Sequence, residues 1–311
     1  MWYDVSEILP ESYIFMRRIV IFSILLTLLC GCSLQTEPAQ IAATTLPVYE
    51  FTGRLCEGTP LTVTRLVTEE VSCLHDYSLN VRQVKAAGAA ETIVISGAGL
   101  EEFMEDVLHH ADLIDASEGI QLIAPEEHHH DHEHNEAEDS HDGHHHEEDP
   151  HIWLSPVNAM AMVENICLGL TERYPQYEST FKKNLAEVQS ELDSLKSYGQ
   201  EQLQTLSCRD LITFHDGFSY FAKSFDLHIL EAVEEESGSE ASAKELIHLI
   251  EEVEHHSLPA IFTEKSGSVS AAGIISRETG CSSYVLDMAM AGDSYFDAMY
   301  HNIDTIKEAL G

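Results

Sequence analysis

The sequence has very little positive charge. It contains 16 Lys and Arg residues against 54 Asp and Glu residues, and its formal net charge is −38 over 311 residues. Nucleic acid and anionic lipid headgroups are polyanions and therefore poor partners for such a chain, whereas cations concentrate near it. We expect no nucleic-acid partner. An acidic surface also keeps a protein soluble, so composition alone does not indicate cation binding.

Motifs of several enzyme and cofactor classes are absent. The sequence has no CxxC pair, which argues against a thiolate metal site. It has no GxSxG motif, and Gly97-Ala98-Gly99 is not followed by the third glycine of a dinucleotide-binding turn. The zinc-protease motif HExxH is also missing. The run His146–Pro150 begins with His-Glu, but its fifth residue is proline instead of histidine, and proline would break the helix that the motif requires. A metallohydrolase needs an open coordination position and a placed general base, so we expect no enzyme.

The apolar run near the N-terminus is too short to cross a bilayer comfortably. It covers the eleven residues Ile19–Leu29, follows the basic Met16-Arg17-Arg18 and precedes Cys30-Gly31-Cys32, the pattern of a secretory signal. The ending resembles a bacterial lipobox, in which Cys32 receives lipid; an ordinary signal with incidental cysteines is the alternative. We expect a signal segment over residues 1–32, with translation starting at Met16. The protein would be exported and anchored by lipid to the outer face of the cell membrane, or periplasmic.

Export makes disulfide bonds chemically reasonable. Cys208 and Cys281 each precede an apolar, strand-like run, and their thiols would lie at one sheet edge if those strands were parallel neighbours. This pair is the first candidate for a disulfide, and Cys56–Cys73 is a weaker one. Cys167 lies within a helical pattern and is expected to be a buried free thiol.

Strand-like and helix-like segments alternate along the chain, which is typical of parallel sheets covered by helices. The expected strands are Leu61–Val67, Thr92–Ser96, Leu113–Asp115, Gln121–Ala124, Leu211–Phe214, His228–Ala232, Ala260–Glu264 and Tyr284–Leu286. The expected helices include Val81–Ala90, Leu100–His110 and Ala243–His255. Three more are expected: one that starts at Phe218, one that runs through Ile274 and a last one that starts at Tyr295.

A long amphipathic helix separates two such regions. Phe181, Leu185, Val188, Leu192 and Leu195 recur at steps of four and three residues. We therefore predict an α/β protein with two lobes that each contain a parallel sheet, residues 33–175 and 207–311. One rigid helix over residues 176–206 would join them.

Histidines are concentrated in one segment. Ten of the nineteen lie between His128 and His151, where almost nothing is apolar, so residues 126–149 are expected to form a mobile loop. Nine of them are candidate weak, auxiliary metal ligands: His128, His129, His130, His132, His134, His141, His144, His145 and His146. An inert acidic spacer is the alternative. A passive metal buffer would use only this segment and would not need two ordered lobes.

Four other residues form a more specific candidate set. They are His75, His151, His215 and Asp287; at least three of them lie at or just beyond the carboxyl ends of predicted strands, and two come from each predicted lobe. Open α/β sheets place ligands at the carboxyl ends of their strands, so these side chains can converge on the cleft between the lobes. Three imidazoles and one carboxylate are a sound tetrahedral set for Zn²⁺. Taken singly, each histidine is more often a capping or core residue.

Four segments resemble the zinc-uptake solute-binding proteins of ABC transporters. They are His75–Leu79 (HDYSL), Asp149–Pro156 (DPHIWLSP), Phe214–Phe221 (FHDGFSYF) and Ser237–Leu246 (SGSEASAKEL), in the family's order. The resemblance implies a two-lobed fold that captures Zn²⁺ in the interlobe cleft, with His75, His151 and His215 as ligands. It also implies delivery to a membrane permease with its cytoplasmic ATPase, and we expect a monomer.

The sequence also departs from the family. Asp287 is followed by Met288 where members often have proline, and Lys265-Ser266-Gly267 replaces a proline-led loop. Glu264 is either an acceptor that orients a histidine or a surface residue at a strand end. Manganese-type relatives carry a carboxylate where this chain has His215, which favours Zn²⁺ over Mn²⁺. A manganese- or iron-type protein of the same fold and a passive exported zinc buffer remain the alternatives.

Overall fold

The computed structural model describes residues 39–69, 71, 74, 77–109, 111–123, 148–233, 242–265 and 269–311. Several predicted features lie outside the described residues: the signal segment with Cys32, the histidine His75, Cys73, the nine histidines from His128 to His146, and residues 237–241 of the SGSEASAKEL segment.

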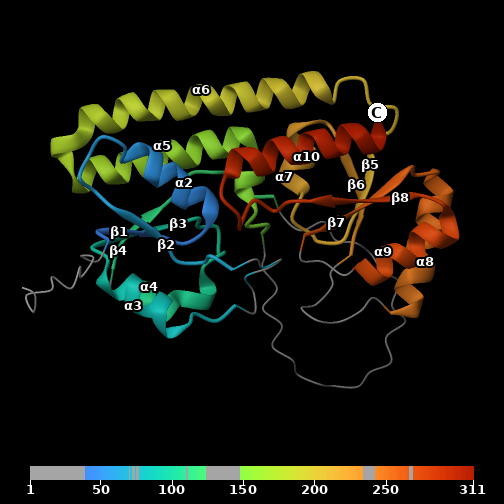
Figure 1. Cartoon of the computed structure of the whole chain (residues 1–311), viewed down its shortest axis with the longest axis horizontal. Helices are drawn as coiled ribbons and strands as arrows, with labels where there is room; N and C mark the ends of the chain where they lie inside the picture. The colour runs from blue at the N-terminus through green and yellow to red at the C-terminus, as the bar shows by residue number, and fades with distance from the viewer. Residues whose placement is uncertain are drawn as a thin grey trace, which may run out of the picture. The chain divides into compact units, whose positions relative to one another are not determined.

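The first lobe contains a sheet of four parallel strands in the order β2-β1-β3-β4. The strands are β1 (Ile41–Ala43), β2 (Val63–Arg65), β3 (Thr92–Ile95) and β4 (Asp112–Asp115). The helices are α2 (Leu46–Leu55), α3 (Val81–Ala89), η2 (Glu102–Met104), α4 (Glu105–Leu108), η3 (Ile152–Leu154) and α5 (Pro156–Arg173). Helices α2 and α5 lie on one side of this sheet and α3 and α4 on the other (Figure 1), so both of its faces are covered.

The second lobe repeats this architecture with strand order β6-β5-β7-β8, again all parallel. Its strands are β5 (Asp210–Thr213), β6 (His228–Ala232), β7 (Ala260–Glu264) and β8 (Ser282–Leu286). Its helices are α7 (Ser219–Ser224), α8 (Ala243–His256), α9 (Val269–Thr279) and α10 (Tyr295–Leu310). Two parallel α/β sheets confirm the predicted fold class.

One long helix connects the two regions. After the short η4 (Pro175–Tyr177), helix α6 runs over Glu178–Gln202, 25 residues. Four of its five predicted apolar positions are buried, and the fifth, Leu185, packs half-buried against the same core. Helix α6 contacts α2, α5 and α10, and it is the long yellow-green helix of Figure 1. Its buried stripe confirms the predicted linking helix.

The predicted disulfide between Cys208 and Cys281 is wrong in this structure, because both are free thiols. The prediction required the strands that follow them, β5 and β8, to be neighbours, but β7 lies between these strands. Two strand spacings amount to about 10 Å, whereas the Cα atoms of a disulfide lie about 4.4–6.8 Å apart. The thiol of Cys208 instead lies 3.7 Å from the Asp210 carbonyl. Cys167 is buried and free, as predicted.

Two further differences concern the first lobe. β1 and α2 were not predicted, although the residues of β1 are fully buried in the centre of the sheet. The strand predicted at Gln121–Ala124 is wrong over its described part, residues 121–123. The backbone of Ile123 is bonded elsewhere: its N–H donates to the Tyr220 hydroxyl, and its carbonyl accepts from the N–H of Asp149.

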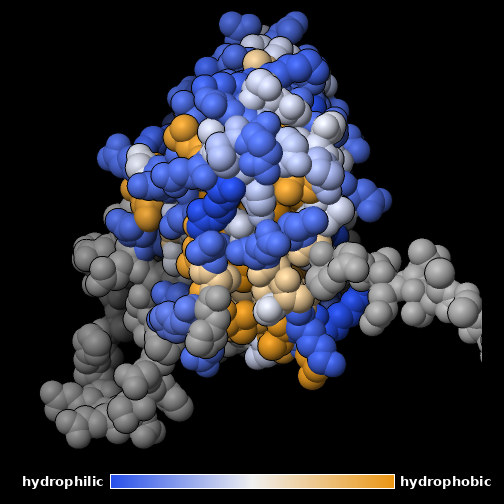
Figure 2. Space-filling view, turned by 90° about the vertical axis from the view of Figure 1, so that its left-hand side faces the viewer, coloured by the Kyte–Doolittle hydropathy of each residue, from blue (hydrophilic) through white to orange (hydrophobic). Residues whose placement is uncertain are grey.

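The surface is mainly hydrophilic on the face shown in Figure 2, with hydrophobic residues gathered in its lower part and a few more above them. Large hydrophobic side chains that are exposed in the described part of the chain are few and scattered: Val81, Val84, Leu113, Val157, Leu168, Ile247 and Val285. Within the described ranges, no helix combines the length and apolar character needed to cross a bilayer.

Candidate metal-binding site

His151 is held by an acidic neighbour on its own segment. Nδ1 of the imidazole lies 2.8 Å from Oδ1 of Asp149, and the same oxygen accepts the backbone N–H of His151 at 2.9 Å. The side chain is only 3% exposed. With the Nδ1 proton donated to the carboxylate, Nε2 carries the free lone pair that a metal ion requires.

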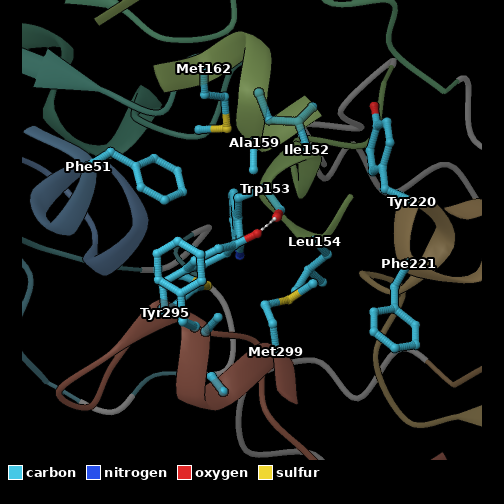
Figure 3. Packing of buried hydrophobic residues seen from close by; sticks show 14 of the residues in the cluster. Phe51, Ile152, Trp153, Leu154, Ala159, Met162, Tyr220, Phe221, Tyr295 and Met299 are labelled. Carbon is cyan, nitrogen blue, oxygen red and sulfur yellow. Dashed lines mark hydrogen bonds between the residues drawn. The ribbon is translucent and has the colours of Figure 1, made fainter. Parts of the chain in front are cut away.

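The chain around His151 is fixed by buried apolar residues. Ile152, Trp153 and Leu154 form the single turn η3 and are fully buried. The indole N–H of Trp153 donates to the Met288 carbonyl, and the Trp153 carbonyl accepts from the hydroxyl of Tyr295 (Figure 3). Helix α5 starts immediately afterwards, with Ser155 as its N-cap and Pro156 in its first turn. His151 therefore follows no strand within the described residues, and its position comes from this turn.

His215 comes from the second lobe and faces His151. It follows β5, and its carbonyl accepts a hydrogen bond from the Thr213 hydroxyl. Nε2 of His215 lies 3.3 Å from Nε2 of His151, with the two ring planes at 86°. Nδ1 of His215 lies 3.7 Å from Oε1 of Glu264. Both imidazoles thus direct Nδ1 toward a carboxylate and Nε2 toward each other.

This separation of the two nitrogens has a chemical meaning. Two nitrogens that each lie 2.0–2.1 Å from a tetrahedral Zn²⁺ ion are about 3.3 Å apart. The carboxylate of Asp149, hydrogen-bonded to Nδ1 of His151, makes Nε2 of that ring a better electron-pair donor toward a cation.

Glu264 is not a surface residue. It ends β7 and is 5% exposed, and its Oε1 lies 3.7 Å from Nδ1 of His215. The surface interpretation of Glu264 is therefore wrong, and its place beside Nδ1 fits an acceptor that orients His215.

Hydrogen bonds hold both the backbone and the carboxylate of Asp287, although the sequence around it departs from the family pattern. It follows β8 and is 7% exposed. Its backbone N–H and carbonyl both bond to the fully buried Asn302 of α10, each at 2.7 Å. One carboxylate oxygen, Oδ1, accepts the N–H of Ala289 at 2.8 Å, and the other, Oδ2, lies 2.5 Å from Nζ of Lys265.

The structure thus brings His151 and His215 together and gives Asp287 a lysine partner. His75 lies outside the described residues. Within the part of the chain that is described, no group of three or more His, Cys, Asp or Glu side chains is close enough to hold a metal ion.

Sequence reasoning missed the tyrosine that contacts this segment. The hydroxyl of Tyr220 accepts from the Ile123 N–H and donates to the Asp149 carbonyl, each at 2.9 Å. Burial raises the pKa of Tyr220 to about 12, so the hydroxyl stays neutral. Residues 124–148 separate its two partners, so one side chain of the second lobe holds both ends of the His-rich segment. In the sequence, Tyr220 is marked only by its place in the segment FHDGFSYF, whose resemblance to the family assigned no role to this residue.

A two-lobed parallel α/β fold with a pair of facing histidines between the lobes is the architecture of metal-binding solute-receptor proteins. Residues 41–309 match the family described as ZnuA, zinc-uptake complex component A, periplasmic. The chain belongs to this family, which is one of substrate-binding transport proteins. The resemblance seen in the sequence is confirmed.

Individual relatives support the same assignment. The chain is 31% identical over 309 residues to the "Zinc-binding lipoprotein AdcA" of Streptococcus pneumoniae, over 92% of this chain and 60% of the relative. It therefore spans about 60% of the length of that curated relative. The crystal structure of ZnuA superposes with a TM-score of 0.73 at 27% identity, covering 88% of this chain and 100% of that one. The Zn(II)-bound ZnuA-like domain of Streptococcus pneumoniae AdcA gives a TM-score of 0.72 at 26% identity, covering 88% and 98%.

Proposed function

We propose that this chain is the extracytoplasmic solute-binding component of a zinc ABC transporter. It captures Zn²⁺ between its two lobes and delivers it to a membrane permease that works with a cytoplasmic ATPase. The observation that carries the proposal is the 3.3 Å separation of Nε2 of His151 and Nε2 of His215, each ring backed by a carboxylate.

The proposed ligand set is His75, His151, His215 and Asp287, with Glu264 orienting His215. Three imidazoles favour Zn²⁺ over Mn²⁺, which prefers oxygen ligands. The names of the relatives, a zinc-binding lipoprotein and a Zn(II)-bound domain, support the same ion. A passive buffer that used only the His-rich segment would have no use for the facing pair His151 and His215.

We also propose that the protein acts as a monomer tethered by lipid on Cys32 to the outer face of the membrane. The relative named a lipoprotein and the family's periplasmic description support an extracytoplasmic location. Replacing Cys32 by Ala should release the protein from the membrane fraction, whereas Cys30→Ala should leave it there. Equal retention of both variants contradicts lipidation at Cys32.

Competitive titration of the soluble mature protein with Zn²⁺ and Mn²⁺ tests the metal assignment. We expect one tight site that prefers Zn²⁺. Replacing His75, His151 or His215 by Ala should each weaken that site. His109→Ala is the matched control, because His109 is exposed and 3.7 Å from Glu105 on its own helix. A His151→Ala protein that binds Zn²⁺ as tightly as the control contradicts the proposal.

A further inference from the structure

A lysine occupies the position next to the proposed acidic ligand. Strands β7 and β8 are in register, with Glu264 opposite Leu286, so the residues that follow them, Lys265 and Asp287, emerge side by side. Nζ of Lys265 lies 2.5 Å from Oδ2 of Asp287. The pair results from the sheet register.

The two oxygens of the Asp287 carboxylate differ in how easily they are freed. Oδ1 accepts a backbone N–H, that of Ala289, and the backbone of Asp287 is bonded to Asn302. These donors cannot withdraw without unfolding the segment. Oδ2 is bonded to a flexible side chain that is 48% exposed, while that of Asp287 is 10% exposed. Lys265 can therefore release Oδ2 to a competing cation and return its ammonium group to water.

We propose that Lys265 is an internal cation that competes with the metal ion for Oδ2 of Asp287 and thereby sets the affinity and release rate of the site. This inference rests on the proposed function. In the empty protein the ammonium group neutralises the carboxylate. When the metal binds, Lys265 gives up Oδ2 but remains a positive charge nearby, which weakens the site. On release, its return to Asp287 stabilises the empty form.

Removing the charge tests the competition. Lys265→Gln should tighten Zn²⁺ binding about tenfold, since a nearby positive charge opposes a dication. It should also slow zinc loss to a chelator. Lys265→Arg keeps the charge and should bind no tighter than wild type. Lys182→Gln is the matched control, because Lys182 also pairs with one carboxylate, Glu178 at 2.6 Å, on the distant helix α6.

Thermal unfolding is a second measurement, in which the zinc-free and zinc-loaded forms of Lys265→Gln should shift in opposite directions. Lys265→Gln should lower the unfolding temperature of the zinc-free protein, because Asp287 loses its partner, and should raise that of the zinc-loaded protein. A merely structural ion pair would lower both.

The double variant Lys265→Gln with Asp287→Asn shows whether the effect passes through the carboxylate. The gain in affinity should disappear in the Asp287→Asn background. A gain that persists there, or one that equals the effect of Lys182→Gln, overturns the inference and leaves the proposed function intact. A wild-type protein without a tight zinc site overturns the proposed function itself.

Discussion

The indole Nε1 of Trp153 donates a hydrogen bond of 2.7 Å to the backbone carbonyl of Met288. Trp153 lies two residues after His151, and Met288 directly follows Asp287. The bond therefore ties together two segments, one from each lobe, that each carry a proposed zinc ligand. Trp153 is fully buried, so the bond is shielded from water.

Replacing Trp153 by Phe removes this donor and keeps an aromatic ring in the core. We expect the free energy of unfolding to fall by about 1–3 kcal/mol, because a buried carbonyl loses a donor. Zinc affinity should also fall, since His151 and Asp287 lose their mutual alignment. Denaturant unfolding and zinc titration measure the two effects.

Tyr295→Phe is the control for this variant. It removes a buried hydrogen bond to the Trp153 carbonyl, 2.8 Å long, without touching Met288. For each variant, the loss of zinc affinity is compared with the loss of unfolding free energy. If this ratio is the same for both variants, the Trp153–Met288 bond does not align the ligands beyond its contribution to stability.

Local pattern predicted most of the helices and the strands of the second lobe, because long amphipathic stretches and apolar runs report directly on burial. It failed at β1, where Ile41, Ala42 and Ala43 are too few and too small to stand out. The adjoining helix α2 has Pro47 as its second residue. Proline suits the first turn of a helix, but it interrupts the hydrophobic pattern by which a helix is predicted.

Contacts that depend on strand order or register were harder to predict. The proposed disulfide failed because strand order is set by the whole sheet. Two partners of Asp149, His151 and Tyr220, lie in the segments DPHIWLSP and FHDGFSYF. Nothing local in the sequence indicates that Lys265 emerges beside Asp287. The family resemblance predicted that His151 and His215 bind the same metal ion and therefore lie close together. Each histidine taken singly is more often a capping or core residue, so their positions alone did not predict this contact.

Asp149→Asn should weaken zinc binding by about 10–100-fold, the usual effect of losing a carboxylate behind a metal-binding histidine. The amide oxygen can still accept from Nδ1, so the ring keeps its orientation while Nε2 becomes a poorer donor. Calorimetric titration measures the change. Asp115→Asn is the control, because Asp115 is exposed and accepts hydrogen bonds from the backbone N–H and hydroxyl of the nearby Ser117. Equal affinities of the two variants would rule out an electronic role for Asp149.

Tyr220→Phe should destabilise the protein by about 1–3 kcal/mol, because the Ile123 N–H and the Asp149 carbonyl both lose a buried partner. Zinc affinity should fall as well, since Asp149 orients His151. Tyr198→Phe is the matched control, because its hydroxyl bonds to Asp304 at an exposed position. Loss of stability without any change in zinc affinity would separate Tyr220 from the site.

Glu101 should make stability depend on pH. It is 4% exposed and accepts hydrogen bonds from Thr44, Ser96 and Gly97. Burial raises its pKa to about 7 from 4.5. The folded state therefore holds a proton that the unfolded state has lost, and the contribution of Glu101 is fully present below pH 4.5 and disappears as pH rises through 7. It amounts to up to about 3 kcal/mol.

Urea unfolding of the metal-free protein between pH 5 and pH 8 measures this contribution against Glu101→Gln, which carries no titrating group. Wild type should lose stability relative to the variant as pH rises. Parallel curves for the two proteins would show that Glu101 does not titrate in this range.

Deleting Glu127–Glu147 separates the His-rich segment from the site between the lobes. The described structure favours a tolerated deletion, because the carbonyl of Ile123 already accepts the N–H of Asp149 at 2.9 Å, and Tyr220 bonds to both residues. Residues 124–126 and 148 would remain to close the loop, a length common for connections in compact domains. His151 would keep Asp149 and His215 as neighbours.

The truncated protein should therefore retain one tight zinc site of nearly unchanged affinity and lose any additional weak sites. Imidazoles tethered near His151 raise the local zinc concentration without new contacts at the site, so growth that depends on this protein should slow only when zinc is scarcest. Calorimetry that counts sites, together with growth across a zinc series, measures both effects. Loss of the tight site on deletion would place the working ligands in the His-rich segment instead of at His151 and His215.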